Sequence, residues 1–443
     1  MRMTVIGTGY VGLVHAVCMA DIGHEVLGVD TDEAWIAALT EGHSPIHEPG
    51  LDELLTRTLA SGRLRFSTSL ADAARFADVH FVCVGTPQMP GGEAADVRQV
   101  DAVIDGMAPL VRPGSLIIGK STVPVGTTAR LGARLRAVAP HSEVAVNPEF
   151  LREGFAVSDT RRPERIVVGA ESRRAEMVLR EIYEPMLISG ARFFSTDPAT
   201  AELVKVASNA FLATKISFIN AMAEVCDAAG ADVVTLADAV GQDSRIGHRF
   251  LQPGLGFGGS CFPKDIRAFA ARAEELGVGE AIAFLRQVDE INLRQRTRTV
   301  DLARDLVGGS FTGRHVGVLG AAFKPGSDDV RDSPALEVAS AIRREGAEVR
   351  VHDPEALDNA RRGFPELQYA FDVPKACEDA DLVLHLTAWP EYRDISPDRL
   401  ASVVRSRKIL DARDTLDATT WQSAGWTLSA LGRPPTNGTY ASA

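Results

Sequence analysis

A glycine-rich turn near the start of the chain constrains the fold most. The segment Gly7-Thr8-Gly9-Tyr10-Val11-Gly12 follows an apolar run, residues 3–6, and leads into an alanine-rich stretch with helical spacing. The next apolar run, residues 25–29, ends at Asp30. Strand, glycine turn, helix, second strand and terminal acid together make the dinucleotide-binding fingerprint of a Rossmann-type sheet. Asp30 can accept both ribose hydroxyls and would repel a 2′-phosphate, so we expect NAD and not NADP.

The pattern of the first 195 or so residues continues this alternation of strands and helices. The strand candidates are Thr4–Ile6, Glu25–Val29, Val79–Val84, Ser115–Ile118, Glu143–Val146 and Arg165–Gly169. This order predicts an α/β fold with a parallel, doubly wound sheet. Ligands of such sheets lie at the carboxyl ends of the strands, so we expect the loops 84–87, 120–124 and 147–149 to face cofactor or substrate.

A long helix is expected next, followed by a second α/β unit. From Thr200 to about Gly230 the chain has no proline and keeps apolar residues at helical spacing, which predicts one helix of about 45 Å. Lys205 and Asn209 share one face of this helix. Further helices continue to about residue 300, and a second Rossmann-like unit begins at 316–320. Its first loop lacks the GxGxxG pattern, so we expect no second dinucleotide.

The composition is that of a soluble globular protein, with 443 residues, 45% of them hydrophobic and 24% charged. A formal net charge of −12 disfavours nucleic acid and anionic membrane surfaces as partners. No apolar run reaches the length of a membrane span, and we expect a cytoplasmic protein. Five scattered cysteines without CxxC spacing predict free thiols, and we expect neither a disulfide framework nor a metal.

One cysteine has the surroundings of a nucleophile. Cys261 lies in the run Gly-Phe-Gly-Gly-Ser-Cys-Phe-Pro-Lys-Asp at 256–265, with Lys264 and Asp265 directly beyond it. Glycines would let a substrate carbon approach the backbone and the thiol together. A purely structural buried cysteine seldom lies among so many glycines and polar neighbours.

The motifs along nearly the whole chain resemble those of the UDP-glucose 6-dehydrogenases, within the UDP-glucose/GDP-mannose dehydrogenase family. They occur in the family's order: GTGYVG, SPIHEPGLDELL, VCVGTP, STVPVGTT, NPEFLREG, ELVKVASNAFLATKISFIN, GGSCFPKD, FKPGSDDVRDSP and LDARD. The resemblance implies an NAD-binding Rossmann domain over 1–197, a central helical dimerisation domain over 198–300 and a nucleotide-sugar-binding Rossmann-like domain over 301–432. Residues 433–443 have the composition of a mobile tail.

The resemblance also implies a four-electron oxidation of a nucleotide sugar at C6. In the family, the cysteine matching Cys261 attacks the aldehyde from the first oxidation, and the thiohemiacetal then loses a second hydride to give a thioester. Water releases the acid. Covalent capture keeps the reactive aldehyde from escaping between the two hydride transfers.

The family also implies roles for other residues. Asp265 and Thr122 would hold a water for proton transfer, Lys205 and Asn209 would stabilise oxyanions, and Glu153 would assist proton removal and hydrolysis. The residues implied near NAD are Gly7, Gly9, Tyr10, Val11, Gly12, Asp30, Thr86, Thr122, Glu153, Lys264 and Arg331. Those implied near the nucleotide sugar are Glu149, Phe150, Leu151, Lys205, Asn209, Phe250, Phe257, Gly258, Phe262, Lys324 and Arg413, together with Arg245 of the partner subunit. Trp35 departs from the pattern, because family members often carry Lys or Arg there, near the adenosine ribose.

The choice of substrate depends on few positions. The GGSC loop resembles the glucose and GDP-mannose branches more than the N-acetylated one, and Arg413 resembles the UDP-glucose branch. We therefore expect oxidation of UDP-glucose to UDP-glucuronate, a polysaccharide precursor, by a homodimer or higher homo-oligomer. The alternatives are a GDP-mannose or other nucleotide-sugar 6-dehydrogenase, a two-electron β-hydroxyacid dehydrogenase, and an NAD-dependent binding scaffold. The number of NADH formed per substrate distinguishes these classes. A 6-dehydrogenase forms two, a β-hydroxyacid dehydrogenase forms one, and a binding scaffold forms none.

Overall fold

The computed structural model describes residues 1–433, so the prediction of a mobile tail at 433–443 falls almost wholly outside the described residues. The chain divides into two compact units. Unit 1 comprises Met1–Ser208 and Arg267–Glu280, and unit 2 comprises Asn209–Ile266 and the described part of Ala281–Ala443. Among residues 1–433, no helix combines the length and the apolar character needed to cross a membrane.

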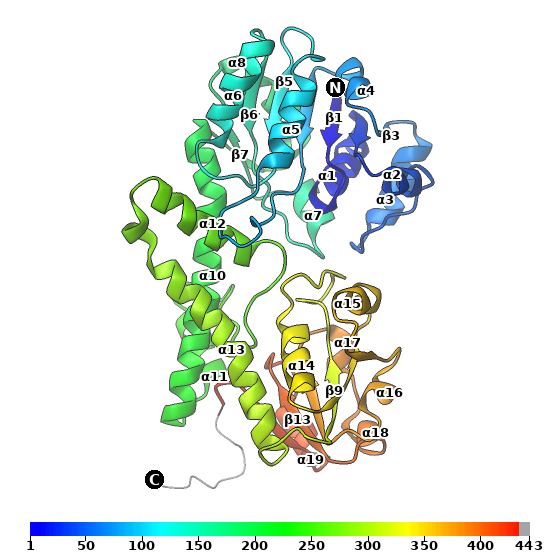
Figure 1. Ribbon diagram of the computed structural model, residues 1–443, viewed down its shortest axis with the longest axis vertical. Coiled ribbons are helices and arrows are strands. Elements are labelled where there is room, and N and C mark those ends of the chain that lie inside the picture. The colour runs from blue at the N-terminus through cyan, green and yellow to red at the C-terminus, as the bar shows by residue number, and fades with distance from the viewer. Residues whose placement is uncertain (434–443) are drawn as a thin grey trace. The chain divides into compact units, whose positions relative to one another are not determined.

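Unit 1 is built on an eight-stranded sheet with the order β3-β2-β1-β4-β5-β6-β7-β8 (Figure 1). The strands are β1 Arg2–Ile6, β2 Glu25–Val29, β3 Leu64–Ser67, β4 Val79–Val82, β5 Leu116–Gly119, β6 Glu143–Val146, β7 Arg165–Gly169 and β8 Arg192–Thr196. The ladders are parallel except for β6 with β7, which pair antiparallel through Val146 and Gly169. The expected all-parallel sheet is therefore wrong at this ladder.

Helices cover both faces of this sheet, as the near-continuous apolar strands require. The helices are α1 Tyr10–Asp21, α2 Glu33–Thr40, α3 Leu51–Ala60, α4 Leu70–Phe76, α5 Arg98–Met107, α6 Thr127–Val138, α7 Ala156–Arg161, α8 Arg173–Ile182 and α9 Glu184–Ile188. One core joins the sheet to α1, α3, α7 and α8, and a second joins it to α4, α5 and α6.

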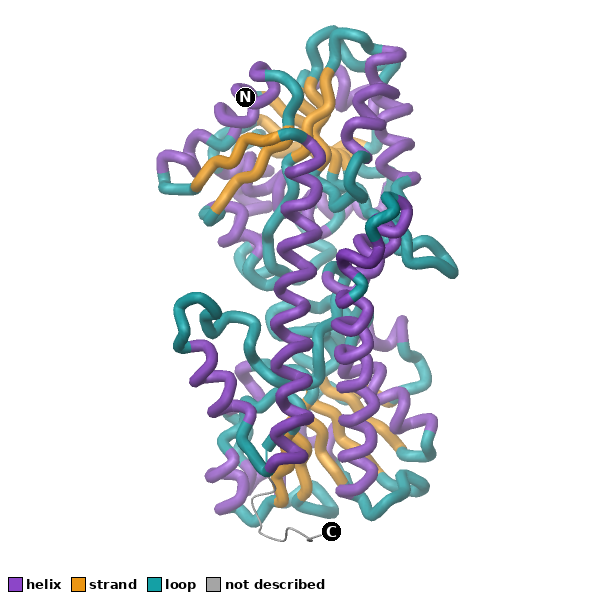
Figure 2. Tube along the Cα trace, turned by 90° about the vertical axis from the view of Figure 1, so that its left-hand side faces the viewer, coloured by secondary structure: helices purple, strands orange, loops and turns teal. Residues whose placement is uncertain are grey.

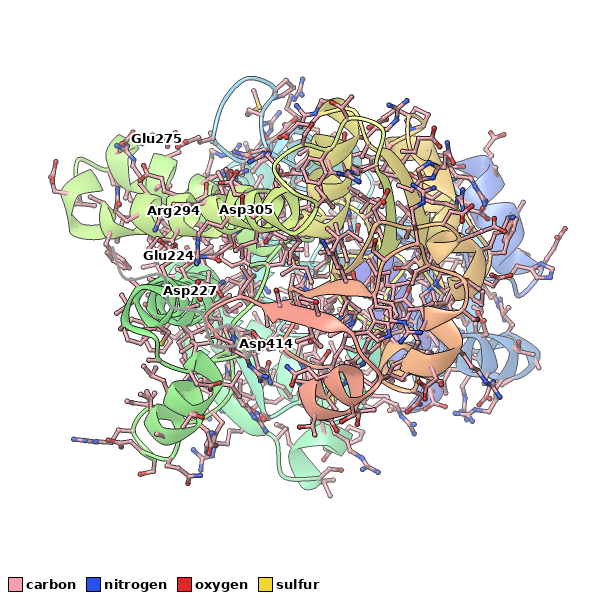
Figure 3. All side chains as sticks on the ribbon, turned by 90° about the horizontal axis from the view of Figure 1, so that it is seen from below. Glu224, Asp227, Glu275, Arg294, Asp305 and Asp414 are labelled. Atoms are coloured by element: carbon pink, nitrogen blue, oxygen red, sulfur yellow. The ribbon has the colours of Figure 1, made fainter. Side chains whose placement is uncertain are left out.

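The predicted long helix is present as α10, Pro198–Ala229, and runs without a break (Figure 2). Its 32 residues correspond to about 48 Å. In unit 2 it is followed by α11 Val233–Gly241, and α13 Phe284–Leu306 lies beside its last turns. Glu224 and Asp227 of α10 face α13, where Arg294 donates to Glu224 across 3.1 Å (Figure 3). α12, Phe262–Glu275, begins in unit 2 and ends in unit 1.

Unit 2 contains a six-stranded, fully parallel sheet with the order β11-β10-β9-β12-β13-β14. The strands are β9 His315–Leu319, β10 Glu348–His352, β11 Gln368–Tyr369, β12 Leu382–His385, β13 Lys408–Asp411 and β14 Thr427–Ala430. The surrounding helices are α14 Pro334–Arg344, α15 Leu357–Gly363, α16 Val373–Cys377, α17 Pro390–Arg393, α18 Pro397–Ala401 and α19 Ala418–Ser423, and a 3₁₀ turn at Gly279–Ile282 precedes α13. The predicted fold class is thereby confirmed.

Asp353, directly after β10, fixes the loop that follows β9. Its Oδ2 accepts the backbone N–H groups of Ala321 (2.7 Å) and Ala322 (2.9 Å) and the indole N–H of Trp389 (3.1 Å). Its Oδ1 accepts two further backbone N–H groups, from residues 355 and 356. The side chain is buried, so these bonds compensate the removal of a carboxylate from water.

Candidate functional site

The glycine turn of unit 1 has the geometry that the fingerprint requires. Gly7 has φ 88°, and a Cβ there would lie 2.8 Å from the backbone N of Val84. A Cβ at Gly12 would overlap the carbonyl oxygen of Gly7, so this glycine lets α1 pack on the turn. No described atom lies within 4 Å of a Cβ at Gly9, which begins α1 without a side-chain cap. The open position and the uncapped helix N-terminus fit a pyrophosphate.

Asp30 follows β2 beside this turn. Its Oδ2 accepts the backbone N–H of Thr8 at 2.8 Å, and its Oδ1 accepts that of Asp32 at 3.3 Å. The indole N–H of Trp35 donates to the carbonyl oxygen of Thr8 at 3.0 Å. Trp35 thus packs against the turn and braces its backbone, and it brings no positive charge to Asp30. These residues fit the ribose of NAD.

Two neighbouring loops after β4 and β5 are tied together. The Thr86 hydroxyl donates to the carbonyl oxygen of Thr122 at 2.8 Å, and the Ser121 hydroxyl donates to that of Val84 at 2.7 Å. The loop after β5 leads into α6, whose N-terminal N–H groups are accepted by the buried carboxylate of Glu202. Glu202 therefore fixes the loop that carries Thr122.

A buried ion pair lies at the carboxyl end of β6. The Lys205 ammonium donates to Glu149 Oε1 at 2.7 Å, and their side chains are 6% and 8% exposed. Glu149 Oε2 also accepts the backbone N–H of Leu151 at 2.7 Å. Close by, Lys120 donates to Asn147 Oδ1 at 3.2 Å, and burial lowers the pKa of the Lys120 ammonium. A buried lysine held by a carboxylate is suited to stabilise negative charge that develops on a substrate oxygen.

The loop that carries Glu153 is anchored by the SPIHEPG segment. Buried Glu48 accepts the backbone N–H groups of Gly154 (2.7 Å) and Val157 (3.3 Å) and the hydroxyl of Tyr10. Burial and the adjacent Glu48 raise the pKa of the Tyr10 hydroxyl. Tyr10 therefore links the glycine turn to the Glu153 loop, while its predicted contact with NAD stays a prediction.

In unit 2, the nucleophile candidate lies at the start of α12. The carbonyl oxygen of Cys261 accepts the backbone N–H of Asp265 at 2.9 Å, and the thiol is partly exposed. Buried Asp265 accepts Asn209 Nδ2 at 2.7 Å on one oxygen and Lys264 Nζ at 2.5 Å on the other. A thiol at a helix N-terminus with an ammonium nearby can form a thiolate more readily. The structure thus brings Asn209, Lys264 and Asp265 together beside the Cys261 turn.

Aromatic rings and one arginine surround this turn. The Phe262 ring contacts Phe257 edge-on with centroids 5.7 Å apart and Phe250 at 6.2 Å. Arg413 donates to the carbonyl oxygens of Leu386 (2.6 Å) and Gly256 (3.1 Å). Its Nη2 is buried without a hydrogen-bond partner among the described residues, and burial lowers the pKa of the guanidinium to about 10. A buried donor of this kind fits an anionic ligand.

The remaining predicted residues lie nearer the surface. Arg245 forms a forked ion pair with Asp243 and its side chain is 87% exposed. Arg331 pairs in the same way with Asp329, and the Lys324 ammonium lies 5.4 Å from the ring centre of Phe323. Their predicted roles toward ligand or partner stay predictions.

Family comparison decides the assignment. Three models of the UDP-glucose/GDP-mannose dehydrogenase family match in order: the NAD binding domain over 1–187, the central domain over 199–294 and the UDP binding domain over 317–418. The chain belongs to this family. The predicted resemblance is confirmed, and so is NAD as the cofactor of this oxidoreductase.

Individual relatives of the family match over the full length. The chain is 41% identical to a UDP-glucose 6-dehydrogenase of Rhizobium meliloti (strain 1021), over 98% of this chain and 100% of that protein. It is 40% identical to the UDP-glucose 6-dehydrogenase TuaD of Bacillus subtilis (strain 168), over 100% of this chain and 95% of that protein. Among solved structures, a UDP-glucose dehydrogenase from Pyrobaculum islandicum matches with a TM-score of 0.89 at 40% identity, covering 98% of both chains.

The structure adds residues that sequence reasoning missed. Glu48 and Glu202 anchor loops in unit 1. Both lie in family motifs, SPIHEPGLDELL and ELVKVASNAFLATKISFIN, but the motifs alone do not show which backbone N–H groups the two carboxylates accept. Asn292 and Arg296 on α13 hold the backbone next to Cys261. No local pattern could have identified these two, because their partners are distant in the sequence.

Removal of the Asp30 carboxylate is expected to weaken NAD binding. In Asp30→Ala the dissociation constant for NAD should rise about 10- to 100-fold, because a hydrogen bond to a charged acceptor contributes about 1.5–3 kcal/mol. Calorimetric titration with NAD measures this. Asp32→Asn is the matched control, since it removes a nearby charge but keeps the cap of α2. Unchanged NAD affinity in Asp30→Ala would show that the ribose is bound elsewhere.

Proposed function

We propose that this protein oxidises UDP-glucose to UDP-glucuronate with two NAD in succession. The observation that carries the proposal is full-length identity of about 40% to several UDP-glucose 6-dehydrogenases. By comparison, the UDP-D-ManNAc dehydrogenase of Pyrococcus horikoshii is 26% identical and the GDP-mannose dehydrogenase of Pseudomonas aeruginosa 28%. These values favour the glucose substrate over the two alternatives.

The proposed reaction passes through a covalent bond to Cys261. NAD, when bound, accepts one hydride from C6 in each oxidation. The alcohol loses a hydride and a proton to give an aldehyde, and the Cys261 thiolate adds to the aldehyde carbon. The resulting oxyanion takes up a proton to give the thiohemiacetal. Loss of a second hydride and a proton gives a thioester, and water cleaves the carbon–sulfur bond to yield the carboxylate and the free thiol.

The chain's own residues have definite tasks in this proposal. Lys205 and Asn209 stabilise the oxygen at C6 when it carries negative charge. Asp265, with Thr122, holds the water that exchanges protons, and Glu153 assists proton removal and hydrolysis. The support from geometry is the burial of the Lys205–Glu149 pair in unit 1 and of the Asn209–Asp265 pair in unit 2.

Nucleotide binding is proposed for the carboxyl edge of the sheet in unit 2. The buried free donor of Arg413 supports contact with an anionic diphosphate. The aromatic group Phe250, Phe257 and Phe262 supports packing against the sugar nucleotide.

The proposal also includes the domain organisation and the location of the protein. The proposed domains are 1–197, 198–300 and 301–432, and the proposed location is the cytoplasm.

A substrate panel tests the proposed function directly. UDP-glucose, UDP-galactose, GDP-mannose and UDP-N-acetylglucosamine are each supplied with excess NAD, and reduced cofactor is measured by its absorbance. We expect two NADH per UDP-glucose and slow or no reduction with the other sugars. One NADH per substrate would indicate a two-electron dehydrogenase, and a preference for GDP-mannose would move the substrate to that branch.

A homodimer is proposed on the basis of an apolar stripe on α10. Phe211, Phe218 and Val225 follow one another at intervals of seven residues and are 67%, 49% and 56% exposed. Side chains at this spacing lie along one helix face, as in paired helices. A second copy of the chain would cover this face. Arg245 of the partner subunit is then proposed to reach the nucleotide sugar, which its exposed guanidinium allows.

Substitution within this stripe is expected to separate the proposed dimer. Phe218→Arg should raise the dimer dissociation constant at least about 100-fold, because an unpaired charge in an interface costs several kcal/mol. Sedimentation velocity over a range of concentrations measures the association. Phe371→Arg provides a control, since Phe371 is 81% exposed outside α10. If Phe218→Arg sediments like the unmodified protein, the stripe is not the interface.

A further inference from the structure

The backbone beside the candidate nucleophile is held by one buried amide. Asn292 on α13 accepts the backbone N–H of Phe257 on its Oδ1 at 2.7 Å and donates its Nδ2 to the carbonyl oxygen of Phe257 at 2.9 Å. The side chain is 1% exposed. A two-bond contact of this kind replaces the hydrogen bonds that a neighbouring strand would supply and fixes both position and rotation of the peptide.

Close packing leaves the loop 256–261 little freedom to move. A Cβ at Gly256 would lie 2.4 Å from Asn292 Oδ1, and one at Gly258 would lie 2.2 Å from the carbonyl oxygen of Asp332. Gly259 has φ 82° and would meet the Phe323 ring at 2.7 Å. The glycines expected to admit a substrate carbon are therefore required here by contacts with the protein itself.

The held peptide is connected to Cys261 through two aromatic rings. Phe257 contacts Phe262 edge-on, with an interplanar angle of 87°. Phe262 is the first residue of α12 and follows Cys261 directly. A displaced Phe257 peptide would therefore shift the first turn of α12 and the thiol that begins it.

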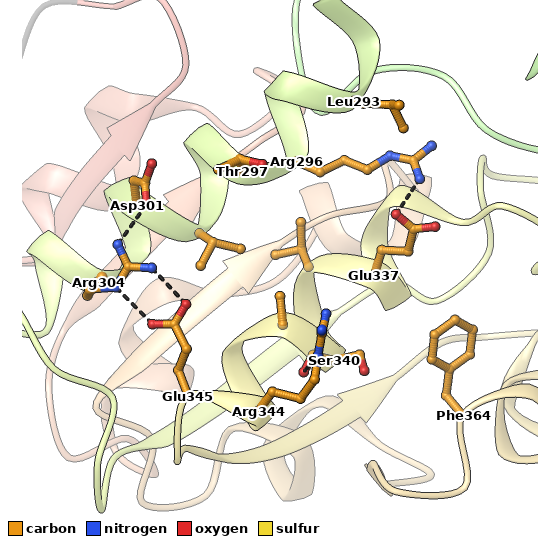
Figure 4. Close-up of a pocket in the computed structure, with 13 residues that line it drawn as sticks. Leu293, Arg296, Thr297, Asp301, Arg304, Glu337, Ser340, Arg344, Glu345 and Phe364 are labelled. Atoms are coloured by element: carbon orange, nitrogen blue, oxygen red, sulfur yellow. Dashed lines mark hydrogen bonds and ion pairs between the residues drawn. The ribbon is translucent and has the colours of Figure 1, made fainter. Parts of the chain in front are cut away.

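A second side chain of α13 supports the same carbonyl group. Arg296 Nη2 donates to the carbonyl oxygen of Phe257 at 3.3 Å, while its Nη1 pairs with Asp332 at 2.8 Å and with Glu337. Arg296 also lines a groove of about 550 Å³ between α13 and α14, where it faces Glu337 (Figure 4). α13 thereby carries both donors to this carbonyl.

We propose that Asn292 is a positioning residue for the nucleophilic thiol of Cys261. This inference rests on the proposed function, because it assumes that Cys261 forms the covalent intermediate. In this role Asn292 acts through the backbone of Phe257 and not by contact with the reacting atoms. It holds Sγ at the N-terminus of α12, where backbone N–H groups stabilise the thiolate and where Sγ meets the aldehyde carbon.

The test compares two buried amides on the same helix. Asn292→Leu removes both bonds to Phe257 at similar side-chain volume. Gln295→Leu is the matched control, because Gln295 is equally buried but donates to the carbonyl oxygen of Asn220 and to Glu224, both on α10, rather than to the loop 256–261. Steady-state kinetics give kcat and KM for UDP-glucose, and mass spectrometry gives the rate of Cys261 alkylation by iodoacetamide across pH.

We expect Asn292→Leu to lower kcat about 100-fold, the effect of roughly 1 Å of misplacement, with KM near the unmodified value. Alkylation of Cys261 should shift to higher pH, because the thiolate loses its stabilised position. Gln295→Leu should leave the alkylation profile unchanged. Normal kcat and alkylation in Asn292→Leu, or equal losses in Gln295→Leu, would overturn the inference.

A second variant serves if Asn292→Leu does not fold. Asn292→Asp keeps the acceptor for the Phe257 N–H and can donate to the carbonyl oxygen only when protonated. Its kcat relative to the unmodified protein should therefore fall as pH rises, and a constant ratio would contradict the proposal. Cys261→Ser distinguishes a failure of the proposed function from a failure of the positioning role of Asn292. Full acid formation by Cys261→Ser would rule out the proposed function. An inactive Cys261→Ser beside a normal Asn292→Leu removes the positioning role alone.

Discussion

Replacement of Cys261 by serine is expected to lower acid formation by at least about 1,000-fold, the scale seen when a nucleophile is removed from a cooperating group of residues. A serine hydroxyl is a far weaker nucleophile than a thiolate at neutral pH, so the covalent step should fail. NAD affinity should stay unchanged, since the NAD-binding fingerprint lies in unit 1 and Cys261 in unit 2.

The measurement follows NADH and acid together in a single reaction. Rapid mixing with UDP-glucose and NAD should show no second NADH per active site in Cys261→Ser. Cys226→Ala is the control, because this thiol is buried in a separate apolar cluster and should be dispensable for turnover. Ordinary acid production by Cys261→Ser would remove the thioester from the mechanism.

Loss of Lys205 is expected to affect both stability and catalysis. Its ammonium pairs with Glu149 in a buried site, and removing one partner of a buried pair costs about 3–5 kcal/mol because the other charge stays behind. In Lys205→Met the Glu149 carboxylate keeps the backbone N–H of Leu151 but loses its counter-charge. Turnover should fall about 100- to 1,000-fold, the effect of removing one donor to a developing oxyanion.

Two further variants separate these effects. Lys205→Met with Glu149→Gln should recover much of the lost stability in urea unfolding, since neither charge of this pair remains, but should not recover turnover. Lys215→Met is the control on α10, because Lys215 donates to the carbonyl oxygens of Ile246 and Gly247 and not to a carboxylate among the described residues. Unchanged stability in the single variant would show that Glu149 takes up a proton or is reached by water.

The fold was largely predictable because its strands are short apolar runs that end in turns. β2, β6 and β7 match the predicted limits, and α10 extends the predicted helix by two residues at its N-terminus. The missed strands are β3, β8, β11 and β14, which lie at the edges of the two sheets. Edge strands bury fewer side chains, as the exposed Phe194 of β8 shows, and so lack a continuous apolar signal.

The candidate site was predictable where chemistry is local in sequence. The glycine turn with Asp30 and the Lys264–Asp265 pair after Cys261 belong to short motifs. Their spacing alone predicted a dinucleotide-binding turn and a nucleophilic cysteine. The Lys205–Glu149 pair joins segments 56 residues apart, and Asn292 lies 35 residues from Phe257. Contacts of this range depend on how elements pack in three dimensions, which a local pattern does not contain.

An aspartate follows the second strand of each sheet, Asp30 after β2 and Asp353 after β10, and the two differ in their hydrogen bonds. Asp30 is half-buried and accepts the N–H of Thr8, the second residue after β1, with capacity left for ribose hydroxyls. Asp353 accepts the N–H of Ala321, the second residue after β9, but four more protein donors saturate it. The Asp30 carboxylate can therefore still accept hydrogen bonds from a ligand, whereas the Asp353 carboxylate has a purely structural role. We therefore propose that a nucleotide on the second sheet is recognised at another part of the same edge, toward Arg413.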